Sequence, residues 1–286
     1  MTNNIEIKGL CKQYPNFKLD NVSFNVPAGS IVGFVGENGA GKTTTIKAIL
    51  DVARRDAGTI TLMGRDNITD GPAARQDVGV VFDEISFHDW LRAPQIDKIL
   101  GNIYKNWDSA YFFQMLGRFG LSEKVRKGTL KTFSRGMKMK LSLAAALAHH
   151  PKLLVLDEAT SGLDPVVRDE ILDIFLEFIG DEGNSILFSS HITSDIEKAA
   201  DYLVFIHQGR IVLNAEKDLL LANYGMLRCD RATWETVDKA HVKGMRDTGY
   251  GIEALIDNRQ DFRPAENMVV DKATVDDIML LTIKGV

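Results

Sequence analysis

The chain has 286 residues, a formal net charge of −5, and a balance of 45% hydrophobic to 26% charged residues. That length allows one large core or two smaller ones. The acidic balance argues against a general nucleic-acid binder, which usually carries a basic face, and no nucleic-acid partner is expected.

The chain carries no sign of a secretory or membrane-spanning segment. The N-terminus lacks the apolar run of a secretory signal, and no stretch approaches the ~20 apolar residues that cross a bilayer. Its two cysteines, Cys11 and Cys229, lie far apart and predict a reduced chain with both thiols used for packing. We therefore expect a soluble chain, with any membrane role supplied by a partner.

Apolar and alternating runs predict an α/β fold. The runs that read as strands are residues 5–10, 22–26, 31–35, 58–62, 78–82, 153–156, 185–189 and 202–206. The first two alternate like half-buried antiparallel strands, whereas residues 153–156 are apolar throughout, as in a parallel strand covered on both faces. A helix is predicted over 166–179, and helical patterning dominates residues 85–150, which read as an insertion.

The last part of the chain is less regular. Residues 251–257 are predicted to form a strand, and Thr274 to Asp277 resemble a capping box that opens a helix through Ile283. We expect residues 216–286 to form a small subdomain that packs on the core or on a second copy of the chain.

A glycine-rich loop follows the predicted strand 31–35. Residues 36–43 read Gly-Glu-Asn-Gly-Ala-Gly-Lys-Thr and fit the phosphate-binding pattern G-x-x-x-x-G-K-[ST]. Glycines let backbone N–H groups converge on phosphate oxygens, and the following helix adds a partial positive charge. Lys42 would meet the β- and γ-phosphates, and the Thr43 hydroxyl would bind Mg²⁺. The sequence therefore predicts a nucleotide site. The side chain of Glu37 is expected to point outward, because an inward carboxylate would repel phosphate.

Two acids end the apolar strand at 153–156. Ligands in open α/β sheets bind at the carboxyl ends of the strands, so Asp157 is placed to hold Mg²⁺. Glu158 is placed to orient or deprotonate an attacking water. Farther along, Ser134 is a good N-cap for a helix whose start is an anion site, and His191 closes the strand at 185–189.

Together these segments resemble the ATP-binding subunit of an ABC (ATP-binding cassette) transporter. Residues 36–43 match its Walker A loop, 133–137 its signature loop, 153–158 its Walker B strand, 161–164 its D-loop and His191 its switch histidine. The resemblance implies a P-loop NTPase core with a mostly parallel sheet, N-terminal antiparallel strands and an inserted helical subdomain.

The likeness covers residues 4–215, so the expected division is an ATP-binding domain at 1–215, with its insertion at 85–150, and the extension at 216–286. The positions it assigns to ATP binding are Tyr14, Gly36, Glu37, Asn38, Gly39, Ala40, Gly41, Lys42, Thr43, Thr44, Ser134 and Gly136. Tyr14 would stack on adenine, the alternative being a core aromatic at a strand edge. It also implies that two subunits enclose each ATP, with Ser134 and Gly136 reaching the partner's γ-phosphate.

The chain departs from the family pattern at two places. The signature loop reads Phe-Ser-Arg-Gly-Met instead of Leu-Ser-Gly-Gly-Gln, so Arg135 adds a cation near the bound anion or points to solvent. The family's Q-loop glutamine is replaced by Asp83, which either takes over a metal-linked role or faces solvent.

The apolar segment 85–91 that follows is expected to form a groove for a membrane subunit and part of the insertion's core, with Phe87 or Trp90 partly exposed.

The resemblance implies an ATPase that powers export through a membrane complex. Its expected partners are membrane subunits and a second, identical or different, ATP-binding subunit, and its expected location is the inner face of the cell membrane. The alternative is a soluble ABC ATPase acting on ribosomes or DNA. That class usually has two phosphate loops or a long coiled coil, and the sequence shows neither.

Overall fold

A six-stranded sheet forms the centre of the molecule in the computed structural model, which describes residues 2–84 and 86–284. Its strands, in spatial order, are β10 (Arg210–Glu216), β9 (Tyr202–His207), β3 (Ile31–Val35), β8 (Ser185–Ser190), β7 (Leu153–Asp157) and β6 (Val78–Val81). Only the edge strand β10 is antiparallel to its neighbour. The parallel sheet that the apolar runs predicted is confirmed, because strands covered on both faces need apolar residues at every position.

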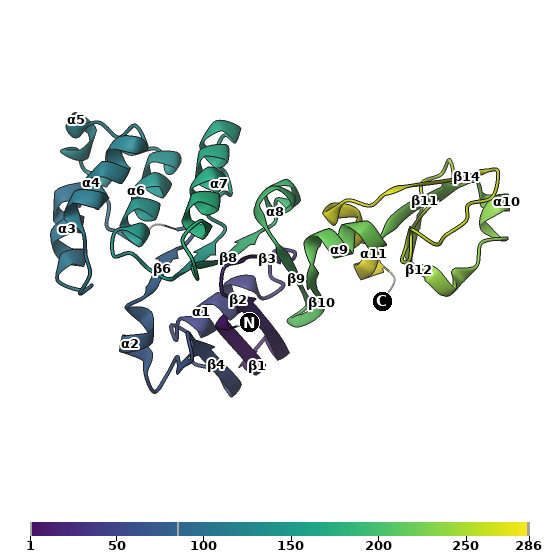
Figure 1. The fold of residues 1–286 in the computed structure, drawn as a ribbon, viewed down its shortest axis with the longest axis horizontal. Coiled ribbons are helices and arrows are strands. Elements are labelled where there is room, and N and C mark those ends of the chain that lie inside the picture. Colours follow the sequence, from purple (N-terminus) through teal and green to yellow (C-terminus); the bar gives the residue numbers. More distant parts are fainter. Residues whose placement is uncertain (1, 85, 285–286) are drawn as a thin grey trace.

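A second, antiparallel sheet packs against one face of the central sheet. Its strands are β2 (Phe17–Pro27), β1 (Asn3–Tyr14), β4 (Ala57–Leu62) and β5 (Arg65–Asp66). The apolar core between the two sheets also contains one face of helix α1 (Lys42–Ile49), including Ile46 and Ile49. This core seats the glycine loop, because α1 begins where that loop ends (Figure 1).

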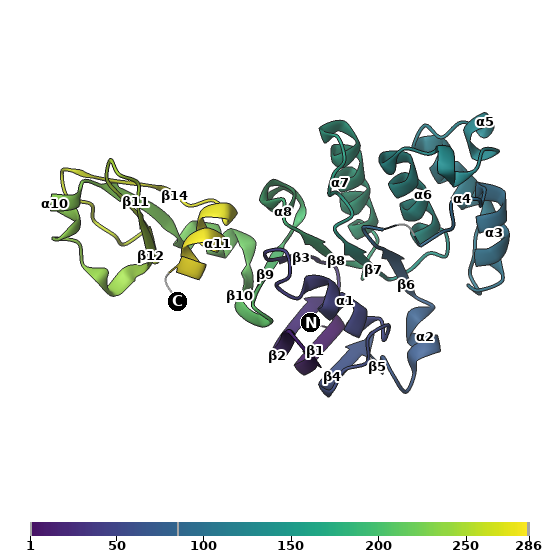
Figure 2. The same ribbon diagram turned by 180° about the vertical axis from the view of Figure 1, so that it is seen from behind.

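Helices cover the other face of the central sheet. The larger core there joins β7 and β8 to buried residues of α6 and α7. The remaining helical segments are α2 (Gly71–Arg75), α3 (Ala93–Gly101), α4 (Ser109–Arg118), α5 (Glu123–Arg126), η1 (Leu130–Thr132), α6 (Arg135–Leu147), α7 (Pro165–Ile179) and α8 (Thr193–Ala199). Helices α3 to α6 gather at one end of the molecule, seen from behind in Figure 2.

The predicted helical stretch 85–150 begins later than expected. Ile85 lies outside the described residues, residues 86–92 contain no helix, and the first helix starts at Ala93. Arg92 is extended, and Pro94 occupies the first turn of α3, where its missing N–H needs no partner. The loop before α3 leaves Trp90 65% exposed and Phe87 partly buried, as predicted.

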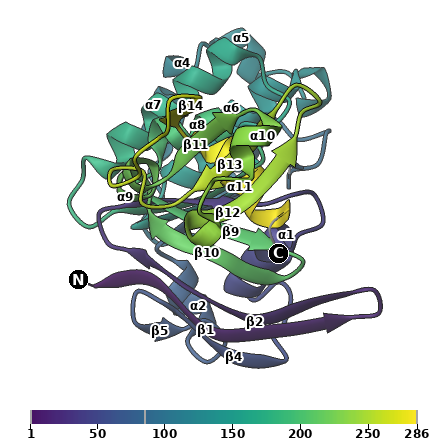
Figure 3. The ribbon, with the colours of Figure 1, turned by 90° about the vertical axis from the view of Figure 1, so that its right-hand side faces the viewer.

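The C-terminal part forms a third sheet at the opposite end of the molecule (Figure 1). Its strands are β12 (Val242–Asp247), β13 (Ile252–Ile256), β11 (Gly225–Cys229) and β14 (Met268–Lys272), all antiparallel, and its helical segments are α9 (Lys217–Asn223), α10 (Arg231–Trp234), η2 (Lys239–His241) and α11 (Val275–Lys284). Figure 3 looks along the long axis of the molecule, with this sheet in front of the rest of the chain.

Helix α11 attaches this sheet to the core. The predicted capping box is present, since the Thr274 Oγ1 accepts from the Asp277 N–H and the Asp277 carboxylate accepts from the Thr274 N–H. The Val275 N–H donates to Glu197 of α8 at 2.7 Å, and Leu281 is fully buried. Within one chain, the C-terminal part therefore contacts the core through α11 and α8, and its packing on a second copy stays a prediction. Strands β11, β12 and β14 were missed, because charged residues interrupt their apolar pattern.

Candidate nucleotide site

The loop from Gly36 to Gly41 leaves β3 and enters α1, and its first and last residues occupy positions that suit glycine. Gly41 has φ +118°, a backbone conformation that side-chain-bearing residues rarely adopt. A Cβ on Gly36 would lie 2.4 Å from the Ile206 carbonyl oxygen. Gly39, at φ +82°, has no atom within 4 Å of where its Cβ would be, so the loop is open on that side. The glycines keep the backbone close to the cleft.

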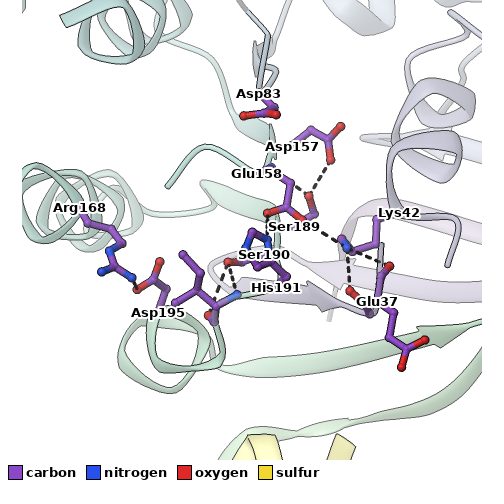
Figure 4. Close-up of polar contacts among 12 residues, drawn as sticks. Glu37, Lys42, Asp83, Asp157, Glu158, Arg168, Ser189, Ser190, His191 and Asp195 are labelled. Carbon is purple, nitrogen blue, oxygen red and sulfur yellow. Dashed lines mark hydrogen bonds and ion pairs between the residues drawn. The ribbon is translucent and has the colours of Figure 1, made fainter. Parts of the chain in front are cut away.

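Lys42, the first residue of α1, places a buried cation inside this loop. Its side chain is 5% exposed, and its Nζ donates to the carbonyl oxygens of Gly36 at 2.7 Å and Glu37 at 3.3 Å. Its Nζ also lies 3.2 Å from Glu158 Oε1. The carboxylate of Glu37 points away from Lys42 and is 63% exposed, which confirms the predicted outward direction (Figure 4).

Asp157 and Glu158 occupy the carboxyl end of β7, as predicted. The Ser189 hydroxyl, on the neighbouring strand β8, donates to Asp157 Oδ1 at 2.7 Å and accepts from the Glu158 N–H at 3.0 Å. Glu158 adopts a left-handed φ of +52°. Such a conformation is strained for a residue with a Cβ and turns its side chain away from the strand direction.

Glu158 bridges two other predicted site residues. Its Oε2 lies 2.6 Å from His191 Nδ1, and its Oε1 is the atom that faces Lys42 (Figure 4). The Glu158 side chain is only 14% exposed, whereas the His191 side chain is 45% exposed. The structure therefore brings Lys42, Glu158 and His191, from three separate segments, into one chain of contacts.

An open cleft of about 750 Å³ is lined by Lys42 and Glu158, whereas His191 contacts Glu158 without lining the cleft itself. Its lining residues are Tyr14, Asn16, Phe17, Glu37, Asn38, Gly39, Gly41, Lys42, Thr43, Thr44, Lys47, Asp83, Asp157 and Glu158. The sequence analysis missed Asn16, Phe17 and Lys47. Lys47 could have been found, because it follows Thr43 by four residues on α1, whereas the place of Phe17 opposite Tyr14 depends on the β1–β2 hairpin.

Tyr14 lies at the tip of the β1–β2 hairpin, on the rim of the cleft. Its ring is 39% exposed, and Lys12 Nζ lies 5.6 Å from the ring centre. An aromatic group in that setting has a free face for a flat ring. The alternative of a core aromatic does not describe a ring exposed to this extent.

Ser134 and Gly136 do not line this cleft. Ser134 caps α6, because its Oγ accepts from the Met137 N–H at 3.2 Å. Both residues border a separate cavity of about 450 Å³, which they share with Gly162 and Asp164 of the predicted D-loop. Within one chain, the signature segment and the phosphate loop are therefore two distinct surfaces.

Asp83 reaches the cleft from the end of β6, but its carboxylate forms an ion pair with Arg135 at the start of α6. Both side chains are about half exposed. The sequence analysis considered Arg135 and Asp83 separately, and the structure shows that the two departures from the family pattern contact each other.

A buried carboxyl group lies behind the site, on α8. Asp195 is 4% exposed, and burial raises its pKa, while Arg168 at 3.6 Å opposes that rise (Figure 4). This pair joins α7 to α8 and does not line the cleft.

The described residues contain no group of three His, Cys, Asp or Glu side chains arranged to hold a metal by themselves. Thr43, Asp157 and Asp83 are among the cleft-lining residues whose side chains carry oxygen, together with Thr44, Glu37 and Glu158. Mg²⁺ prefers oxygen ligands, keeps several waters and commonly takes the rest of its shell from substrate phosphates. The donor set therefore fits Mg²⁺ delivered with a nucleotide.

A strand, a glycine loop with a buried lysine, a helix and a second strand, two places away in the same sheet, that ends in acids define a P-loop nucleotide hydrolase. The sequence model of the family described as "ABC transporter" matches residues 19–161. Among curated proteins, a lantibiotic transport ATP-binding protein of Streptococcus pyogenes is 35% identical over 75% of this chain and 91% of its own length. A daunorubicin/doxorubicin resistance ATP-binding protein of Streptomyces peucetius is 32% identical over 78% of this chain and 68% of its own length.

Solved structures agree. An ATP-binding subunit of an ABC transporter superposes with a TM-score of 0.68 at 26% identity, covering 76% of this chain and 92% of that one. A cassette solved as a dimer with ADP and Pi has the same fold, with a TM-score of 0.65 at 20% identity over 74% and 98% of the chains. The chain belongs to the ABC transporter ATP-binding family, and it is an ATPase. No helix among the described residues is long and apolar enough to span a membrane.

Proposed function

We propose that this chain hydrolyses Mg²⁺-bound ATP to power export through a membrane transporter. The observation that carries the proposal is the position of Glu158, held between Lys42 and His191 at the edge of the phosphate cleft. A carboxylate in that position can orient and deprotonate the attacking water, while the lysine stabilises phosphate charge.

The other cleft residues bind and orient the nucleotide. Loop residues 36–41 would present backbone N–H groups to the phosphates, with Lys42, Thr43 and Thr44 at the helix start. Tyr14 would support the adenine ring. Thr43, Asp157 and Asp83 are the residues that would hold Mg²⁺, which neutralises phosphate charge when bound. His191 would hold Glu158 in place and stabilise charge on the γ-phosphate.

A second ATP-binding chain, identical or different, would complete the site. Ser134 and Gly136 lie at the N-terminus of α6, a good anion site, yet they border a different cavity from their own phosphate loop. Placed against the cleft of a partner, they would bind its γ-phosphate. The related cassette solved as a dimer with ADP and Pi supports this arrangement.

The membrane partner would dock beside Asp83. A cavity of about 680 Å³ opens there and is bordered by the exposed Trp90 and the partly buried Phe87. The relatives are named for lantibiotic transport and for daunorubicin/doxorubicin resistance, which favours export of a compound from the cell. The proposed location is the inner face of the cell membrane. We also retain the division into an ATP-binding domain at 1–215, with its insertion at 85–150, and an extension at 216–286.

Sedimentation from native cells tests this function. The chain should pellet with membranes, and Trp90→Ser should release it, whereas Tyr250→Ser, at a fully exposed tip of the C-terminal sheet, should not. If the original chain and both variants are recovered with ribosomes or DNA, the result would favour the alternative, a soluble ABC ATPase. Equal membrane binding by the two variants would contradict docking beside Asp83.

A further inference from the structure

Arg135 contacts two other loops of the candidate site. Its guanidinium pairs with Asp83, which follows β6 of the core. The same group packs over the tight turn of Gly162, where a Cβ would lie 3.1 Å from the Arg135 Cζ. Arg135 is also the first residue of α6, next to Ser134. One side chain therefore joins the helical insertion to the central sheet and to the turn that follows Glu158.

Asp83 belongs to both the nucleotide cleft and the outer cavity beside Trp90. Strand β6 pairs with β7, and Val81 lies beside Leu156, one residue before Asp157. The two carboxylates therefore face the same cleft from neighbouring strands. Asp83 therefore lines the same cleft as Asp157, but in this structure its partner is Arg135.

We propose that Arg135 is a positioning residue that competes with the nucleotide-bound metal for Asp83. While Asp83 pairs with Arg135, this ion pair holds α6 against the core. When the metal binds with nucleotide, the Asp83 carboxylate contacts the metal instead, and the ion pair with Arg135 is broken. The inference rests on the proposed function for the identity of the metal–nucleotide ligand. Because both side chains are half exposed, the pair is weak, and its loss changes an equilibrium constant by a few-fold.

The charge of Arg135 sets the direction of the effect on metal binding. Arg135 cancels the charge of Asp83 and adds a positive potential beside the metal position, and both effects oppose binding of a divalent cation. Removing Arg135 should therefore tighten metal binding, whereas removing Asp83 should weaken it or leave it unchanged. In a chain without Asp83, loss of Arg135 should have a much smaller effect.

Binding of Mn²⁺ in the presence of ADP, followed by electron paramagnetic resonance, measures this competition without hydrolysis. Arg135→Gln should bind Mn²⁺ about three- to five-fold more tightly than the original chain. Lys138→Ala is the matched control. It also removes a cation from α6 near the same cavity, but its partner is Asp89 at 2.6 Å, within the insertion loop. The proposal is overturned if Arg135→Gln leaves the Mn²⁺ affinity unchanged. It is also overturned if Arg135→Gln raises that affinity as much in a chain with Asp83→Ala, or if Lys138→Ala raises it as much as Arg135→Gln does.

A second measurement needs no nucleotide at all. Spin labels at the exposed Val52 in the core and Lys124 in α5, in a chain with Cys11→Ser and Cys229→Ala, report the position of the insertion. The distance distribution should broaden in Arg135→Gln but not in Lys138→Ala. An unchanged distribution would show that the pair does not hold α6. This readout is independent of ATP hydrolysis and of transport, so its failure is distinct from failure of the proposed function.

Discussion

The nucleotide cleft and the C-terminal sheet place their charged groups in opposite ways. At the cleft, Lys42, Asp157 and Glu158 are largely buried and converge at the ends of strands. In the C-terminal sheet, Arg228 pairs with Glu253 on one neighbouring strand and with Asp271 on the other, on an exposed face. Parallel strands covered on both faces leave polar groups room only at their ends, so charges gather there. An antiparallel sheet with one open face spreads its charges in pairs across strands.

If the cleft alone carries the chemistry, changes at the cleft should alter turnover, and changes in the C-terminal sheet should alter only stability.

Replacing Glu158 with Gln should lower the turnover of ATP by about 10³-fold, because the amide cannot accept a proton from water. Nucleotide affinity should remain, since Gln keeps the size of the side chain and Lys42 still faces the phosphates. Phosphate release and equilibrium binding of a fluorescent ATP analogue measure the two quantities. Lys42→Ala is the companion variant and should weaken binding itself. Full turnover in Glu158→Gln would remove this residue as the base.

Leu281→Ala should reduce the free energy of unfolding by about 3 kcal/mol, because a fully buried leucine on α11 is replaced by a cavity. Turnover per folded molecule should stay unchanged, since α11 does not line the cleft. Chemical denaturation and phosphate release at a temperature where the variant is folded provide the measurements. A comparable loss of turnover in the folded variant would show that the C-terminal sheet acts on the site.

His149 should make the core sensitive to acid. It is buried and stacks on Tyr104 with 3.9 Å between ring centres, and burial lowers its pKa from 6.5 to about 4. The His149 imidazole of the unfolded chain therefore binds a proton below pH 6.5, whereas in the folded chain it stays neutral down to about pH 4. The contribution of neutral His149 to the free energy of unfolding is therefore present above pH 6.5. It is lost as the pH falls from 6.5 to about 4.

Between pH 6.5 and pH 5 this loss amounts to about 2 kcal/mol. His149→Phe keeps an aromatic ring against Tyr104 and cannot titrate. Denaturation curves at both pH values should show a correspondingly smaller loss for the variant. Equal losses for the two proteins would mean that His149 does not control this part of the acid response.

Arg228→Ala should have the smallest effect. Its side chain is 46% exposed, and Glu253 keeps a second partner in Arg246, so the expected loss of stability is below about 1 kcal/mol. Turnover should not change. A large fall in phosphate release at unchanged stability would break the comparison, because it would give the C-terminal sheet a part in the chemistry.

Much of the core was predictable from the sequence, and less of the C-terminal sheet. Strands β7 and β3 are buried along their whole length, and their short apolar runs, bounded by loop residues, could be recognised in the sequence. Strand β12 alternates weakly, and β14 has no fully buried residue. Such strands are ordered by the hydrogen bonds and side chains of their neighbours, which a local pattern does not contain. Phe17 was missed for a similar reason, since its place opposite Tyr14 depends on the hairpin.

The sequence by itself determined the phosphate loop, the acids at the end of β7 and the cap at Ser134, because each depends on residues adjacent in the chain. Tertiary structure alone decided which of these groups meet. Glu158 reaches His191 across 33 positions, and Asp83 reaches Arg135 across 52. Those contacts depend on the order of strands in the sheet and on how the insertion packs, and both are set by burial summed over the whole chain.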